Sequence, residues 1–200
     1  RVEDAVLAAR LGVDAIGLVF AARSRRQVTP AQACAIVHAL PPFVTTVALF
    51  MDDDARLVDD VIQRVQPDLL QFHGEEGDAW CMQFGRPFLK AVAMGEGASA
   101  LPRLRDYPHA SGLLLDGHGP GEAGGSGKAF DWSLVTSVLT QPLIVAGGLH
   151  AGNVADAVRR LRPWAVDVAS GVEAAPGIKD AARLAAFIRA VREADAELAG

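Results

Sequence analysis

Two apolar runs that each end at glycine, late in the chain, limit the possible folds more than any other feature of this sequence. The runs and their end residues are 143–146 with Gly147-Gly148 and 165–169 with Ser170-Gly171. Continuous apolar runs bounded by turn residues are typical of strands that are buried on both faces. The amphipathic segment 153–161 between them predicts a helix. Strand, helix and strand at this spacing predict a βαβ unit, in which the two strands are parallel neighbours.

The two glycine ends predict a binding site for an anion. The carboxyl ends of parallel neighbours lie at the same edge of a sheet, so both turns are expected side by side. Glycine has no Cβ, so backbone N–H groups can approach a ligand closely, and a nearby helix N-terminus favours negative charge. We therefore expect Gly147, Gly148, Ser170 and Gly171 to hold a phosphate group. The alternative is that these glycines only form tight turns.

The rest of the chain repeats the alternation of apolar strands and helices. Thr29-Pro30 is typical of a helix start, because threonine caps a helix and proline fits its first position. The segments expected as strands are 14–20, 45–51, 68–74, 88–94, 112–116, 143–146 and 165–169. The segments expected as helices are 2–11, 30–40, 53–65, 75–84, 98–107, 130–139, 153–161 and 180–198.

This alternation predicts an α/β fold, and the late glycine turns favour a (β/α)8 TIM barrel over an open doubly wound sheet. Doubly wound sheets usually carry their glycine fingerprint after the first strand, whereas barrels place phosphate sites after their last strands. A closed barrel of this type has eight strands, and the sequence predicts seven. Because a barrel lacking a strand would expose two apolar edges, we expect the first strand upstream of Arg1. Residues 1–200 are then a single barrel domain that is N-terminally incomplete.

Composition excludes several classes of protein. Half of the 200 residues are hydrophobic, which is enough for one sizeable core. The formal net charge is −5 and no basic run exceeds two residues, which argues against nucleic-acid binding. No apolar stretch approaches the roughly 20 residues of a membrane span, and no signal peptide opens the chain, so a cytoplasmic protein is expected. Cys34 and Cys81 fall in predicted helices far apart and show neither a metal-site spacing nor a disulfide pattern.

Polar residues at the carboxyl ends of strands are the candidates for chemistry, because barrel active sites lie there. Asp116 ends one strand and leads into a loop with six glycines in residues 117–129. We expect it to be a partly buried general acid or base, with a helix cap as the alternative. His73 ends another strand, with Gln71 two positions earlier on the same face. His73 is expected either to serve catalysis or substrate contact, or to be a hydrogen-bonded structural residue.

Other charged residues near strand ends have weaker functional interpretations. Three arginines lie within residues 23–26, and one of them could bind a carboxylate in bidentate fashion. Their spacing alone does not say which. Asp167 and Lys90 lie inside predicted strands, and we expect each to satisfy a buried polar network rather than to orient the site. Lys128 is expected to be a loop lysine.

Several sequence pieces occur in the order found in one enzyme family. They are DAIGLVF followed by SRRQVTPAQA, then LQFHG, LLLD, GGSGKAFDW, IVAGGL with GNV, and VDVASGVEAAPGIKD, and they span about residues 2–192. On these pieces the chain resembles the phosphoribosylanthranilate isomerase family of tryptophan biosynthesis. The resemblance implies a (β/α)8 barrel and an Amadori rearrangement of N-(5-phosphoribosyl)anthranilate to the 1-deoxyribulose phosphate. It implies no cofactor, no metal, a small phosphosugar substrate, and a monomer or homodimer.

The resemblance also implies roles for the site residues. Asp116 would be the general acid, Arg26 would contact the anthranilate moiety, and Gln71 and His73 would line the site. Phosphate would bind the backbone N–H groups of Gly147, Gly148, Ser170 and Gly171.

The family's general base is a cysteine in a K-I-C-G type motif at the end of the first strand. Cys34 and Cys81 do not match that position, so the base is expected on the upstream strand. His118 lies in the six-glycine loop and is expected to be solvated.

Two alternatives remain open. The chain could be another phosphosugar-binding barrel enzyme, such as one similar to indole-glycerol-phosphate synthases or to metal-dependent epimerases. Lys90 is the only strand lysine and His73 the only strand-end histidine, which disfavours both. It could also be a non-catalytic phosphate-binding barrel, which would need neither Asp116 nor Arg26.

Overall fold

The computed structural model describes residues 1–119, 129–135 and 140–199. Lys128, most of the glycine-rich loop after Asp116, and part of the segment expected as a helix at 130–139 lie outside these ranges.

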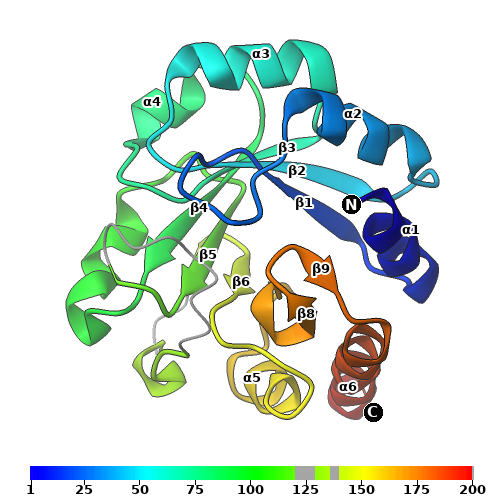
Figure 1. Cartoon of the computed structure of the whole chain (residues 1–200). Helices are drawn as coiled ribbons and strands as arrows, with labels where there is room; N and C mark the ends of the chain where they lie inside the picture. The colour runs from blue at the N-terminus through cyan, green and yellow to red at the C-terminus, as the bar shows by residue number, and fades with distance from the viewer. Residues whose placement is uncertain (120–128, 136–139, 200) are drawn as a thin grey trace.

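Seven strands in the described ranges form one parallel sheet whose order follows the chain (Figure 1). They are β1 (Ala15–Val19), β2 (Thr45–Phe50), β3 (Leu69–Phe72), β4 (Phe88–Ala93), β5 (Gly112–Asp116), β6 (Leu143–Val145) and β7 (Ala165–Val166). Each strand pairs in parallel with the next. The sheet curls into a half-barrel with helices on its outer side (Figure 1). The predicted strands and their parallel order are confirmed.

Helices connect these strands. The α-helices are α1 (Val2–Leu11), α2 (Pro30–Ala39), α3 (Ala55–Val65), α4 (Asp78–Met82), α5 (Val154–Leu161) and α6 (Ala181–Ala199). The 3-10 helices are η1 (Gly97–Arg105), η2 (Trp132–Leu134) and η3 (Ser170–Val172). The predicted start of α2 is confirmed: the Thr29 hydroxyl accepts the Gln32 N–H at 3.2 Å, and the Gln32 side chain accepts the Thr29 N–H at 2.8 Å. This reciprocal pair is a capping box.

The helix predicted at 75–84 is wrong in its first turn, because α4 begins only at Asp78. Side chains bind the backbone groups that would otherwise start the helix. The Gly74 N–H donates to Glu76 at 2.9 Å, and the Glu75 N–H donates to Asp52 at 2.7 Å. Side-chain acceptors of this kind compete with helical hydrogen bonds and hold a loop instead.

The last strand is also shorter than predicted, and a hairpin follows it. Beyond β7 and η3, the strands β8 (Glu173–Ala175) and β9 (Ile178–Lys179) pair antiparallel. A two-residue turn at Pro176-Gly177 joins them, and Gly177 has φ 79°, a left-handed conformation that glycine adopts at no steric cost. Sequence reasoning missed this hairpin because each strand is too short to show alternation.

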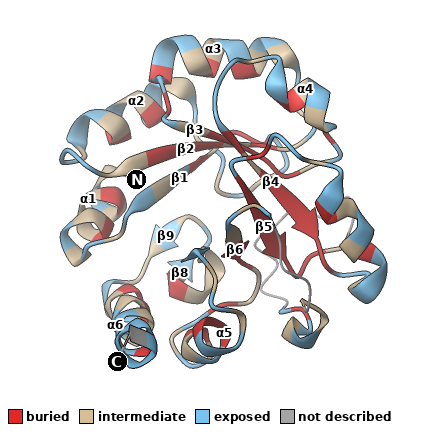
Figure 2. Ribbon diagram, turned by 180° about the vertical axis from the view of Figure 1, so that it is seen from behind, coloured by how far each residue is buried: buried red, intermediate tan, exposed pale blue. Residues whose placement is uncertain are grey.

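Apolar side chains fill both faces of the strands, as the continuous apolar runs predict. On the outer face Phe20 stacks on Phe50 with ring centroids 5.5 Å apart, in the core shared with the helices. A second cluster, on the other face, contains Ala91, Leu114 and Ile144. Figure 2 shows that buried residues concentrate in the middle strands, whereas edge strand β1 is more exposed.

The outer helices meet where the sheet is open. Arg192 of α6 donates to the backbone oxygens of Leu11, at 3.1 Å, and Gly12, at 3.3 Å, at the end of α1. Strands β1 and β7 are the two edges of the sheet and pair with no further strand in the described ranges. None of the described helices is both long and apolar enough to span a bilayer.

Candidate active site

The carboxyl ends of six strands, β1, β2, β3, β5, β6 and β7, surround one cavity. It is lined by Val19, Ala21, Arg23, Ser24, Arg26, Leu49, Met51, His73, Asp116, Gly147, Gly148, Leu149, Asp167, Val168, Ala169 and Ser170. Six of the eight predicted site residues therefore meet in one place. Gln71 and Gly171 do not line the cavity but contact residues that do.

Asp116 lies at the centre of a buried cluster with two histidines. It is the last residue of β5 and only 3% exposed. Its Oδ2 atom lies 3.4 Å from His73 Nε2, and its Oδ1 atom lies 3.3 Å from His118 Nδ1. The backbone N–H of His118 also donates to Oδ1 at 3.3 Å. Each carboxylate oxygen thus faces one imidazole.

This cluster sets the charge of the carboxyl group. Burial raises the pKa of Asp116, but the close contacts of its carboxylate with His118 and His73, and the charge of these rings, outweigh burial and hold that pKa well below its ordinary value. Asp116 is therefore ionised at rest. A general acid at this position must receive a proton before it can donate one.

The same three side chains offer ligand atoms for a metal. Among the described residues, His73, Asp116 and His118 bring their ligand atoms within 4.8 Å of one another. Imidazole and carboxylate groups are also the side chains that most often transfer protons in acid–base sites.

The expectation that His118 is solvated is wrong, because the residue is 2% exposed. The loop that carries it is held against the end of β4: the Gly95 N–H donates to the His118 carbonyl at 2.9 Å. A Cβ at position 95 would lie 2.7 Å from that carbonyl oxygen, so only glycine allows this approach. The glycine-rich composition around His118 predicted a solvated side chain, and the one sign of contact was a glycine 23 residues away in sequence.

The glycine ends of β6 and β7 form adjacent turns, as the sequence predicts. Gly147 and Gly148 have φ values of 77° and 64°, a region that disfavours residues with a Cβ. Among the described residues no acceptor binds their backbone N–H groups. Asn153, before α5, supports the turn by donating to the Gly148 carbonyl at 2.9 Å. Gly171 packs directly on the Leu149 carbonyl, leaving no room for a Cβ.

Arg26 forms a bidentate ion pair across the open side of the sheet. Its Nε and Nη2 atoms donate to the two oxygens of Glu173 at 2.8 and 2.7 Å. Lys179 lies 3.4 Å from the same carboxylate. Burial raises the pKa of Glu173, but Arg26 and Lys179 together lower it below its ordinary value. Of the three arginines in the loop, Arg26 is thus the one held in a fixed direction, while Arg23 also reaches the cavity.

Asp167 lines the cavity instead of satisfying a buried network, which corrects the prediction. The residue as a whole is exposed to solvent just after β7, while the residues that line the cavity surround its carboxyl group. That enclosure, followed by the negative charge of Asp116, raises the pKa of Asp167. Two carboxyl groups in one cavity with pKa values shifted in opposite directions are typical of acid–base sites.

Gln71 contacts the ring of His73 on the side away from Asp116. It is 6% exposed, and its Nε2 atom lies 3.3 Å from His73 Nδ1. With Nδ1 facing the amide, the Nε2 edge of His73 is directed to Asp116.

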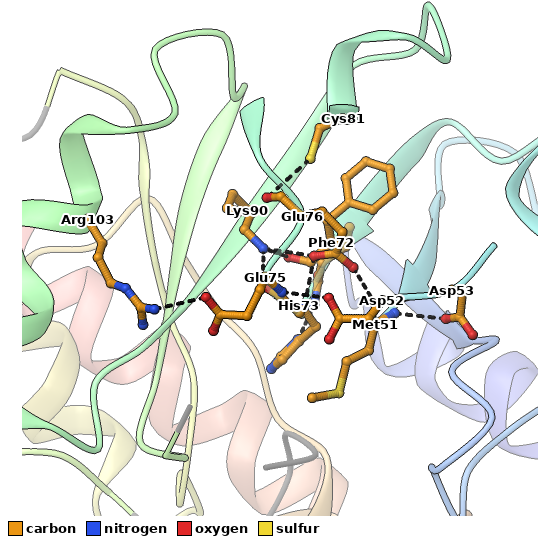
Figure 3. Close-up of polar contacts among 12 residues, drawn as sticks. Met51, Asp52, Asp53, Phe72, His73, Glu75, Glu76, Cys81, Lys90 and Arg103 are labelled. Atoms are coloured by element: carbon orange, nitrogen blue, oxygen red, sulfur yellow. Dashed lines mark hydrogen bonds and ion pairs between the residues drawn. The ribbon is translucent and has the colours of Figure 1, made fainter. Parts of the chain in front are cut away.

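Lys90 satisfies a buried network, as predicted, and Figure 3 shows it reaching toward Glu76 beside His73. Its Nζ atom lies 2.9 Å from Glu76 Oε2 and also donates to the carbonyls of Gly74, at 2.5 Å, and Phe72, at 3.3 Å. Glu76 also accepts the Asp52 N–H at 2.7 Å. The network ties β4 to the turns that follow β2 and β3, including the turn that carries His73.

Sequence reasoning missed the two buried carboxylates that pair with Arg26 and Lys90. Glu173 and Glu76 are 6% and 7% exposed, but neither stands at a predicted strand end. Glu173 lies within a motif that carries the resemblance, yet its partner Arg26 is 147 positions away.

The curled parallel sheet, the paired glycine turns and the buried carboxylate between two histidines define an α/β half-barrel enzyme of the kind that handles phosphorylated substrates. The model of the N-(5'-phosphoribosyl)anthranilate isomerase family matches residues 1–190. The chain therefore belongs to the phosphoribosylanthranilate isomerase family.

Individual relatives agree with this membership. The isomerase of Pseudomonas paraeruginosa is 55% identical over 192 residues, covering 96% of this chain and 91% of its own. That of Nitrosospira multiformis is 51% identical over 191 residues, covering 96% and 92%.

Solved structures of isomerases superpose closely on the fold. The Thermus thermophilus enzyme has a TM-score of 0.86 at 40% identity and covers 96% of this chain and 94% of its own. A phosphoribosylanthranilate isomerase in complex with reduced 1-(o-carboxyphenylamino)-1-deoxyribulose 5-phosphate has the same TM-score at 34% identity and the same coverage.

Proposed function

We propose that this protein catalyses the Amadori rearrangement of N-(5-phosphoribosyl)anthranilate to 1-(2-carboxyphenylamino)-1-deoxyribulose 5-phosphate, a step of tryptophan biosynthesis. The observation that carries the proposal is that one cavity is lined by glycine turns suited to a phosphate, an arginine suited to a carboxylate, and the buried Asp116. The reaction oxidises C2 of the sugar and reduces C1 within one molecule, so it requires acid–base groups and no external oxidant.

Asp116 is the proposed general acid. It protonates the ribose ring oxygen as the C1–O bond breaks and the anthranilate nitrogen forms a C=N bond to C1. His73 lines the site beside it, and Gln71 contributes by holding the His73 ring through the Nδ1 contact. The histidine contacts on both oxygens support a carboxyl group that exchanges its proton readily.

The lining of the cavity offers a binding group for each of the two charged ends of the substrate. The phosphate binds the backbone N–H groups of Gly147, Gly148, Ser170 and Gly171. Arg26, in the loop after β1, binds the anthranilate carboxylate, for which its remaining N–H groups are suited. The reacting sugar carbons then lie near Asp116, which lines the same cavity.

The general base is expected on a strand that completes the barrel. We propose that the curled sheet is part of a (β/α)8 barrel whose eighth strand pairs between β7 and β1. The contact of α6 with α1 supports this, because the helix layer closes where the sheet does not. The carboxyl end of that strand would face the cavity, where the resemblance implies the cysteine base.

Three broader statements stay predictions. They are a single barrel domain, a cytoplasmic location, and a monomeric or homodimeric state.

Turnover tests the proposal. Phosphoribosylanthranilate fluorescence should fall with time when the full-length protein, its N-terminus verified by intact mass, is added. Inorganic phosphate should inhibit competitively. Phosphate binding without turnover would instead support the non-catalytic phosphate-binding barrel.

A further inference from the structure

His118 is a buried polar residue that the proposed function leaves without a role. Its ring lies 4.7 Å from the His73 ring, measured between centroids, with the planes inclined by 32°. The two rings lie side by side, and each contacts one oxygen of the Asp116 carboxylate. Neither His73 Nε2 nor His118 Nδ1 has a well-formed hydrogen bond, although both atoms are fully buried.

Burying two imidazole nitrogens without good partners costs free energy, so the arrangement calls for an explanation beyond stability. At 3.3 and 3.4 Å the nitrogen–oxygen distances exceed the roughly 2.7–2.9 Å of a charge-assisted bond. A proton on one ring can shorten its own contact with Asp116 and lengthen the other. The geometry therefore suits a proton that moves between three groups.

The position of His118 is built into the fold rather than left to a loose loop. The His118 backbone N–H donates to Asp116, and its carbonyl accepts from Gly95. The absence of a side chain at Gly95 is what lets this segment approach β4. These contacts hold the ring in place while the substrate exchanges.

We propose that His118 is a positioning residue that shares a proton with Asp116 and His73, so that the carboxyl group can be protonated again after each ring opening. The inference rests on the proposed function.

The proton balance of this cycle closes without another reagent. Asp116 gives its proton to the ring oxygen and becomes a carboxylate. The imidazolium of His118 or His73 then returns a proton to the carboxylate, and that ring takes a proton from solvent. At C2, the base removes the carbon-bound proton and returns it to C1. The C2 hydroxyl of the enolamine loses its proton to solvent as the ketone forms, which offsets the proton that the ring took from solvent.

Other charged groups face this cluster and contribute to its pH dependence. Asp167, after β7, acts on Asp116 and His73 through its charge, and Lys179 of β9 acts on Asp167. The variants that test the role of His118 therefore leave Asp167 and Lys179 unchanged.

The experiment compares His118→Asn and His118→Gln with the wild type. Asparagine keeps a donor near the position of Nδ1, and glutamine keeps one near Nε2, but neither side chain ionises. We expect kcat to fall about 10-fold to 100-fold in both variants, a part of the roughly 10²–10⁴-fold that general acid–base catalysis supplies. KM should change less than about 2-fold, and the pH profile of kcat should change shape. His38→Asn, at an exposed histidine on α2, should leave both unchanged.

Two results would overturn the inference while the wild type still turns over. One is an unchanged kcat and pH profile in both variants, and the other is full rescue by asparagine, which would mean that hydrogen bonding alone suffices.

A second measurement does not depend on turnover. The NMR titration of the His73 ring should shift in His118→Asn and stay fixed in His38→Asn, and an unmoved titration would overturn the sharing of a proton. Absence of turnover in the wild type would count against the proposed function only.

Discussion

The buried pair of Lys90 and Glu76 allows a prediction of stability. Both side chains are almost fully enclosed, with 1% and 3% of their surface exposed, and their charged atoms lie 2.9 Å apart. The substitution Lys90→Met keeps a side chain of similar length and removes its positive charge. It leaves the Glu76 carboxylate buried with backbone N–H donors only, and it removes a donor from two carbonyls.

The size of the effect follows from this burial. Removing one partner of a buried ion pair costs about 3–5 kcal/mol. For a domain of this size, each kcal/mol lowers Tm by about 2–4 °C, so Lys90→Met should lower Tm by about 6–20 °C. The exposed pair of Arg64 and Asp60, at 3.1 Å with 52% and 45% exposed, is a matched control. Arg64→Met should cost less than about 1 kcal/mol.

Urea unfolding of the wild type, the two single variants and the double variant measures the coupling free energy between Lys90 and Glu76. Lys90→Met combined with Glu76→Gln should recover part of the loss, because the amide oxygen still accepts backbone N–H groups but carries no charge. A coupling free energy of about 1–3 kcal/mol is expected, within the range found for contacting residues. If Lys90→Met costs no more than Arg64→Met, the reasoning about uncompensated buried charge is wrong for this network.

Three further predictions concern the site. Burial raises the pKa of Asp116, but the contacts with His118 and His73 outweigh it and hold that pKa below its ordinary 3.8. The stabilising contribution of Asp116 is therefore complete above about pH 4 and is lost as pH falls below it, so acid unfolding should be less steep in Asp116→Asn. Glu173→Gln should raise KM about 10-fold with little change in kcat, because Arg26 loses its fixed direction; an equal fall in kcat would contradict this. Gly148→Ala, at φ 64°, should cost about 1–2 kcal/mol and weaken competitive inhibition by phosphate. Gly17→Ala, in strand β1 with open space around the added Cβ and no left-handed φ, should do neither.

Sequence patterns predicted the site residues that stand at strand ends, because the ends of buried strands are marked by where an apolar run stops. Continuous apolar runs located the strands, and the parallel order then brought His73, Asp116 and Gly147 to one edge. Each of these residues stands directly after or at the end of an apolar run, so its place follows from a short stretch of chain.

The remaining parts of the site depend on contacts between distant segments. His118 is buried because a glycine in another loop leaves room for its backbone, and Glu173 matters because Arg26 reaches it. The first turn of the helix predicted from residue 75 is absent because the carboxylates of Glu76 and Asp52 accept the backbone N–H groups there, and Glu76 also pairs with Lys90 of β4. Nothing in the local composition distinguishes such residues from solvated loop residues.

The turnover of phosphoribosylanthranilate by the full-length wild type and by Asp116→Asn, side by side, tests the central claim most directly. Inorganic phosphate binding to both proteins is measured in parallel. We expect wild-type turnover, a fall in kcat of about 10²–10⁴-fold in the variant, and equal phosphate affinity. Undiminished turnover in Asp116→Asn would contradict the assignment of the general acid, and phosphate binding without turnover in the wild type would contradict the isomerase itself.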